Sequence, residues 1–172
     1  MNKPRRIAGA VLAGGRSSRM GQNKALMTYH GQTLLDHAIG LLQQTGIEDV
    51  FVSGAYEGYR CIPDRAEFFG PAAALRDILQ ELKNYDGVLA VPVDMPLLTA
   101  EILTRLTAQN GGAFYEEFPL PAFIPLPSST LKKGDKDSVY ALLEQLGIQA
   151  IPLSNPSAFT NVNAPEDWNV LP

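Results

Sequence analysis

Residues 12–26 read LAGGRSSRMGQNKAL, and this stretch continues an apolar run, Ile7–Ala13. An unbroken apolar run that ends at glycines predicts a strand buried on both faces of a parallel sheet. The loop that follows holds three glycines, three cations and no acidic residue. Glycine lets a backbone approach a ligand closely, and exposed N–H groups beside arginine and lysine bind polyphosphates. The stretch therefore predicts an α/β fold with a phosphate-binding loop after its first strand.

The same glycine-rich loop also fits a purely structural role. Glycine and serine are ordinary loop residues, so the stretch could be a solvated connection between a strand and a helix. A Walker loop requires Gly-Lys followed by serine or threonine, whereas Gly21 is followed by glutamine and Lys24 by alanine. The dinucleotide fingerprint requires spaced glycines, whereas Gly14 and Gly15 are adjacent. The sequence thus supports neither a P-loop ATPase nor a Rossmann dehydrogenase.

The rest of the chain alternates between strand-like and helix-like segments, which predicts a three-layer α/β/α sandwich with a mostly parallel sheet. Prolines in the segment 120–124 predict an edge strand or irregular pairing there. We expect one domain over residues 1–172, with no internal repeat or linker. Strands are expected over 49–53, 60–62, 88–93, 113–115, 120–124 and 149–153, and helices over 33–46, 71–82, 99–108 and 138–146.

Composition excludes several classes of protein. The chain has 172 residues, 45% of them hydrophobic, and a net charge of −4, which argues against a nucleic-acid surface. No apolar run approaches the length of a membrane span, and no signal peptide is evident, so we expect a cytoplasmic protein without a membrane partner. Cys61, the single cysteine, cannot form an internal disulfide and is interpreted as a strand residue.

Asp94 is the strongest candidate for a metal ligand. It follows the buried strand 88–93, and ligands of α/β proteins bind beyond the carboxyl ends of the strands. Mg²⁺ prefers oxygen ligands and is usually held by one or two carboxylates together with substrate phosphates. The alternative is that Asp94 only caps the turn at Met95-Pro96.

Several motifs together resemble the molybdenum cofactor guanylyltransferases, a family of nucleotidyltransferases with a Rossmann-like, GT-A-like sheet. The first is Leu-Ala-Gly-Gly followed by Ser-x-Arg-Met-Gly and a lysine. The others are Val93–Pro96, which resembles the family's metal-binding segment, Phe69–Pro71, which resembles its Gly-Pro turn, and Asn161–Asp167, which resembles its C-terminal Asn-x-Asn-x-Pro-Glu segment. The chain length also fits one domain of this family.

The resemblance implies a set of site residues. Arg19, Lys24 and Asp94 would be catalytic, with Asp94 holding Mg²⁺. Asn161 and Asn163 would orient the metal or the acceptor phosphate, although asparagine before proline is also ordinary turn chemistry. The implied nucleotide-binding residues are Leu12, Ala13, Gly14, Gly15, Lys24, Asp64 and Asp94.

Three positions fit the family pattern less well. Arg16 matches a variable position, and Glu67 lies in the same segment as Asp64. Ser53 stands where some family members carry an asparagine that contacts the nucleotide, so its contact with the base is open.

The implied reaction transfers GMP from GTP to molybdopterin carrying molybdenum, giving a molybdopterin guanine dinucleotide and pyrophosphate. Molybdoenzymes would be the proteins that receive the product. Two alternatives stay open: a cytidylyl- or sugar-phosphate nucleotidyltransferase of the same fold, and a module that binds nucleotide or cofactor without catalysis. The presence of both Lys24 and Asp94 argues against the non-catalytic module.

Overall fold

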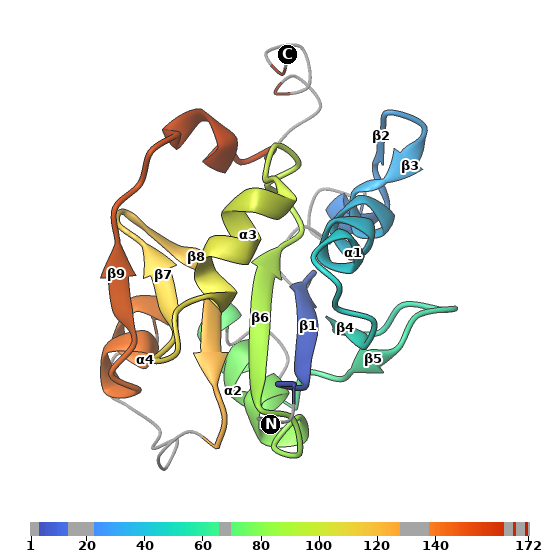
Figure 1. The fold of residues 1–172 in the computed structure, drawn as a ribbon. Coiled ribbons are helices and arrows are strands. Elements are labelled where there is room, and N and C mark those ends of the chain that lie inside the picture. The colour runs from blue at the N-terminus through green and yellow to red at the C-terminus, as the bar shows by residue number, and fades with distance from the viewer. Residues whose placement is uncertain are drawn as a thin grey trace.

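A seven-stranded sheet runs through the whole protein (Figure 1). The structure is a computed structural model that describes residues 4–13, 23–65, 70–127 and 138–163, together with Asp167 and Leu171. The strands lie in the order β5-β4-β1-β6-β8-β7-β9. Their bounds are β1 Ile7–Leu12, β4 Val50–Ser53, β5 Cys61–Ile62, β6 Gly87–Pro92, β7 Ala113–Tyr115, β8 Phe118–Pro125 and β9 Gln149–Ile151.

The predicted mostly parallel sheet is confirmed. β1 pairs in parallel with β4 and β6, β4 with β5, and β7 with β9. β8 runs antiparallel to both of its neighbours, β6 and β7. As a result, all the strands except β8 point toward one edge of the sheet, at the top of Figure 1.

The prolines of β8 were expected to mark an edge strand, and that expectation is wrong. β8 lies between β6 and β7. The alternative expectation, irregular pairing, is confirmed, because the register with β7 shifts so that Phe114 opposes Ala122 while Tyr115 opposes Phe118. Pro119 and Pro121 lie inside this irregularity, where a missing N–H costs no regular ladder bond.

Helices cover both faces of the sheet, as a three-layer sandwich requires. α1 (Leu34–Gln44) and α3 (Ala100–Thr107) pack on one face, and α2 (Pro71–Glu81) and α4 (Val139–Gln145) on the other. Side chains of a strand alternate between faces. Leu89 and Val91 of β6 accordingly join the core under α1 and α3, while Val88 and Ala90 join the core under α2 and α4.

The helices begin where the sequence places capping residues. Thr33, Thr99 and Ser138 each accept a hydrogen bond from a backbone N–H in the first turn of α1, α3 and α4. α2 instead begins with Pro71 at its first position, where the missing N–H has no partner to lose. Each helix is thereby fixed at its start, and α3 begins a few residues after the carboxyl end of β6.

Three small elements were not expected. A short helix of the 3₁₀ type, η2 (Lys24–Leu26), follows the glycine-rich loop, and a two-stranded hairpin, β2 (Thr28–Tyr29) with β3 (Gln32–Thr33), leads into α1. A second 3₁₀ helix, η3 (Pro156–Phe159), lies in the segment that crosses the top of the sheet after β9 (Figure 1). None of the described helices has the length and apolar character needed to cross a membrane.

Candidate active site

The ends of β1 and β6 bring two predicted site segments together. The two strands are parallel neighbours in register from Ile7 opposite Gly87 to Leu12 opposite Pro92. Beyond the last pair, the Val93 N–H donates to the Leu12 carbonyl oxygen at 3.2 Å. Asp94, which follows β6, therefore stands beside the start of the glycine-rich loop that follows β1.

Three side chains from distant parts of the chain meet at this edge. The Lys24 ammonium donates to Asp94 Oδ2 at 3.1 Å and to Asn163 Oδ1 at 2.9 Å. The side chains of Lys24 and Asp94 are only 17% and 27% exposed, so the ion pair is partly shielded from water. Shielding strengthens the attraction between the two charges. Lys24, Asp94 and Asn163 thus form one polar cluster, which we call the Lys24 cluster.

The C-terminal segment is attached to the turn after β6. The Val162 N–H donates to the Asp94 carbonyl oxygen at 2.8 Å, and the Val162 side chain is fully buried. On the next residue, the Asn163 N–H donates to Asp167 Oδ2 at 2.6 Å. These bonds hold Asn163 beside Lys24; Asn161 and Asn163, the two predicted asparagines, are both exposed.

The donor set of the Lys24 cluster suits a small hard cation. The Lys24 ammonium shows that a positive charge fits between the carboxylate oxygen of Asp94 and the amide oxygen of Asn163. Among the described residues, no group of three or more His, Cys, Asp or Glu could hold a metal ion alone. A magnesium site with few protein ligands is normally completed by substrate phosphates and water. The cluster has the composition of such a site.

Two side chains of the neighbouring strand region fix the backbone of Ala13, the last described residue before the glycine-rich loop. The buried Ser53 Oγ accepts a hydrogen bond from the Ala13 N–H at 3.0 Å, and the Tyr56 hydroxyl donates to the Ala13 carbonyl oxygen at 2.8 Å. Ser53 therefore contacts the loop in this structure. Both backbone polar groups of Ala13 are bonded within the protein.

Tyr56 also reaches the far end of the same loop. Its hydroxyl lies 3.3 Å from Asn23 Oδ1, and Asn23 caps η2 by accepting from the Ala25 N–H at 3.2 Å. Burial raises the pKa of the Tyr56 hydroxyl, so the group stays a neutral donor at physiological pH. Sequence patterns did not single out Tyr56, because a tyrosine between two turn glycines carries no motif.

Asp64 lies on the loop after β5, where its negative charge helps to raise the pKa of Tyr56. It is partly buried, and burial together with the nearby negative charge of Asp77 raises the pKa of its carboxyl. Asp77 accepts from the Arg65 backbone N–H at 3.0 Å and pairs with the Arg65 guanidinium, which anchors this loop to α2. Carboxyl groups with a shifted pKa are common in functional sites.

The remaining predicted site residues divide into two groups. Leu12 is buried at the end of β1, beside the Lys24 cluster. The others fall outside the described residues: Gly14, Gly15, Arg16, Arg19 and Glu67.

Comparison with known sequences identifies the family of this chain. The sequence profile of the family described as MobA-like NTP transferase domain matches residues 9–119. A molybdenum cofactor guanylyltransferase of Xanthomonas euvesicatoria is 36% identical, and the match covers 99% of this chain and 97% of that relative. The chain belongs to the MobA-like NTP transferase family. It is therefore a nucleotidyltransferase, as the motifs predicted.

Solved structures agree on the fold of this MobA-like enzyme. Molybdopterin-guanine dinucleotide biosynthesis protein A from Archaeoglobus fulgidus superposes with a TM-score of 0.68 at 18% identity, covering 95% of each chain. A Mycobacterium tuberculosis H37Rv protein, solved in complex with manganese, superposes with a TM-score of 0.64 at 18% identity, covering 96% of this chain and 97% of that one. At this identity the likeness concerns the fold alone.

Removing the Tyr56 hydroxyl should weaken the anchoring of Ala13. We expect Tyr56→Phe to lower the free energy of unfolding by about 1 kcal/mol, because a buried carbonyl loses its donor. Urea denaturation measures this change. Tyr140→Phe is the matched control, since Tyr140 is 44% exposed and water can replace its hydroxyl contacts. Equal stability of Tyr56→Phe and the wild type would show that the bond to Ala13 adds nothing.

The raised pKa of Asp64 predicts a pH dependence of stability. The folded protein holds this proton more tightly than the unfolded chain, so the contribution of Asp64 is greatest in acid and is lost as the pH rises through the raised pKa. The stability of the wild type relative to Asp64→Asn should therefore fall as the pH rises above about 4. Urea denaturation of both proteins at a series of pH values tests this.

Asp49 provides a control of opposite sign. Hydrogen bonds from Arg60 and Tyr85 lower the pKa of its carboxyl, so its contribution is present at neutral pH and lost in acid. The stability of the wild type relative to Asp49→Asn should rise over the same pH series. Parallel trends for the two variants would contradict the opposite directions assigned to the pKa shifts of Asp64 and Asp49.

Proposed function

We propose that this MobA-like enzyme transfers GMP from GTP to the molybdenum-carrying molybdopterin cofactor, forming molybdopterin guanine dinucleotide and pyrophosphate. This proposal rests on the contact of Lys24 with Asp94 and Asn163 at the carboxyl edge of the sheet. The full-length relationship to the Xanthomonas guanylyltransferase supports the choice of substrates.

The reaction forms one bond and breaks one. A terminal phosphate oxygen of the acceptor attacks the α-phosphorus of GTP, and the bond from that phosphorus to the bridging oxygen breaks, which releases pyrophosphate. The protein needs no covalent nucleophile, because positioning and charge stabilisation account for most catalysis of this type. The Lys24 ammonium neutralises phosphate charge as pyrophosphate departs, and Asn163 Oδ1 keeps that ammonium oriented.

Asp94 is the residue that would hold Mg²⁺, and Asn163 Oδ1, which accepts from the same Lys24 ammonium, could supply a further oxygen. A bound Mg²⁺ would stabilise negative charge on the phosphate oxygens around the reacting phosphorus. Lys24 would then turn its ammonium from Asp94 toward the phosphates. A flexible lysine can make this exchange, because its charge is compact and its stem is long.

The nucleotide would lie along the glycine-rich loop. In this proposal Arg19 is catalytic, and the residues that bind the nucleotide include Leu12, Ala13, Gly14, Gly15 and Asp64. Because the Ala13 N–H and carbonyl are already bonded to Ser53 and Tyr56, Ala13 would serve mainly as the fixed start of the loop. We further propose that residues 1–172 form one domain, because a single sheet takes strands from residue 7 to residue 151. We also propose a cytoplasmic location.

A pyrophosphate assay tests the proposed reaction. The protein is incubated with Mg²⁺, molybdenum-carrying molybdopterin and each NTP in turn, and pyrophosphate release is measured. We expect release with GTP and formation of the guanine dinucleotide. Release with CTP alone would identify a cytidylyltransferase, and nucleotide binding without release would identify a binding module.

Asp94→Asn tests the metal role with almost no change in size. We expect turnover to fall at least about 100-fold, because the hard charged ligand is lost at the reacting phosphate. Asp86→Asn is the matched control, since Asp86 precedes the opposite end of β6 and accepts from the Arg6 N–H. Circular dichroism checks that both variants fold. Full turnover of Asp94→Asn would remove Asp94 from the metal role.

A further inference from the structure

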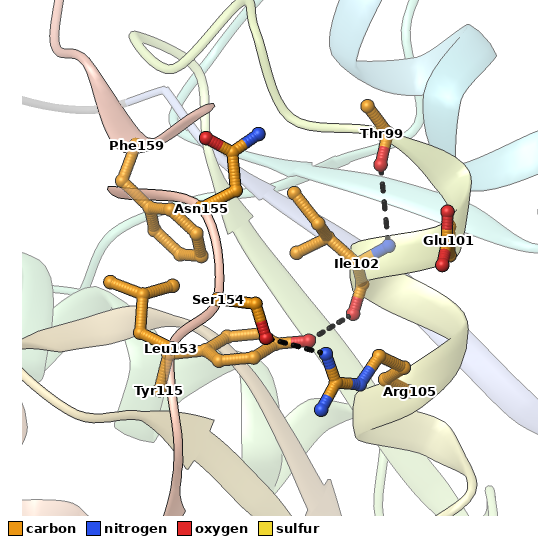
Figure 2. A pocket seen from close by; sticks show the side chains of 9 residues that line it. All are labelled: Thr99, Glu101, Ile102, Arg105, Tyr115, Leu153, Ser154, Asn155 and Phe159. Carbon is orange, nitrogen blue, oxygen red and sulfur yellow. Dashed lines mark hydrogen bonds between the residues drawn. The ribbon is translucent and has the colours of Figure 1, made fainter. Parts of the chain in front are cut away.

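A cavity of about 210 Å³ lies between α3 and the segment that follows β9 (Figure 2). Four apolar side chains line it: Ile102, Tyr115, Leu153 and Phe159. Tyr115 and Phe159 are buried and meet edge to face, with ring centroids 5.3 Å apart. The Tyr115 hydroxyl donates to the Ile102 carbonyl oxygen at 2.8 Å, which ties the end of β7 to α3 beside the cavity.

Polar side chains line the rest of the cavity. Glu101 and Arg105 lie one helical turn apart on α3, so a carboxylate acceptor and a guanidinium donor stand along the same side. The Arg105 guanidinium donates to Ser154 Oγ at 3.3 Å across the cavity, as Figure 2 shows. Apolar walls with a few polar groups are typical of sites that bind small molecules.

The cavity lies on the opposite side of Asp94 from the glycine-rich loop. In the sheet, β1 precedes β6, whereas β7 and β9 lie beyond β6 and β8. Tyr115 ends β7, and Leu153 follows β9, so the cavity opens at the same edge as the Lys24 cluster. A donor nucleotide on the β1 side and a second ligand in the cavity would therefore approach Asp94 from opposite sides.

The chain that forms the cavity wall continues into the Lys24 cluster. Asn163 follows Phe159 by only four positions, which limits the distance between their Cα atoms to about 14 Å. A ligand of modest length could thus place one end in the cavity and a phosphate beside Lys24 and Asp94. The cavity is smaller than the roughly 300–1,000 Å³ of sites that enclose a whole ligand, and its size suits one ring system of a longer molecule.

From these observations we infer that the cavity holds the pterin ring of the acceptor, an inference that rests on the proposed function. A pterin presents a 2-amino-4-oxo edge, whose N–H groups donate to a carboxylate and whose carbonyl accepts from a guanidinium. Glu101 and Arg105 supply these two partners, and the partly exposed side chains of Ile102 and Leu153 supply apolar contact. Guanine has the same edge, but the loop assigned to GTP lies on the other side of Asp94.

Binding of a pterin without phosphate tests the inference directly. The intrinsic fluorescence of 6-hydroxymethylpterin reports its Kd for the full chain, and steady-state assays report KM for the acceptor and for GTP. We expect Glu101→Gln and the cavity-filling variant Ser154→Phe each to raise the pterin Kd and the acceptor KM about tenfold or more. KM for GTP should not change.

Two variants outside the cavity serve as controls. Glu144→Gln repeats the charge loss on α4, and Thr104→Phe adds the same ring at an exposed position of α3. Both should leave the pterin Kd, the acceptor KM and the KM for GTP unchanged. Thermal unfolding checks that all four variants fold.

The outcomes separate this inference from the proposed function. Normal GMP transfer with pterin Kd and acceptor KM unchanged in both cavity variants would overturn the inference and leave the proposed function intact. Pterin binding that the cavity variants weaken, in a protein that transfers no GMP, would support the cavity and contradict the proposed function. A raised KM for GTP, with guanosine displacing the pterin, would assign the cavity to the nucleotide base and also overturn the inference.

Discussion

The parallel pairing of β1 with β6 is the constraint on which the candidate site depends. Six consecutive residue pairs fix the two strands in register, so their carboxyl ends finish at the same level. One end leads into the glycine-rich loop and Lys24, and the other leads directly to Asp94. A slip of one residue would turn every side chain of the shifted strand to the other face, exchanging the cores under α1 and α2. The cores thus enforce the register, and the register brings Lys24 and Asp94 into contact.

Much of this fold follows from local sequence patterns. Unbroken apolar runs predicted β1 and β6, because strands covered by helices on both faces need no polar side. Capping residues predicted the starts of α1, α3 and α4 closely, since a hydroxyl before an apolar helical pattern serves the first free N–H groups. The placement of Asp94 at the functional edge also followed from its position after a buried strand.

The features that sequence patterns missed depend on contacts between distant segments. The central position of β8 is one, because Pro119 and Pro121 lie where the register with β7 is broken. Tyr56 is another, since its contacts with Ala13 and Asn23 arise from the way the loop after β4 folds back. The resemblance implied that Asn163 orients the metal or the acceptor phosphate, but its contact with Lys24 was not predicted, because no local pattern links residues that lie 139 positions apart.

The bond between Val162 and Asp94 has a consequence for the order in which the protein becomes active. Chains emerge from the ribosome from the N-terminus, and domains fold as their elements become available. The strands β1 and β6 are complete once Pro92 has emerged, but Asn163 joins the Lys24 cluster only through the segment that follows β9. Contacts between residues so far apart in the sequence form late, because the chain loses the entropy of closing the loop before the contact can stabilise it. A nascent chain therefore carries Lys24 and Asp94 before it carries Asn163, and the cluster is complete only after the segment that follows β9 has emerged.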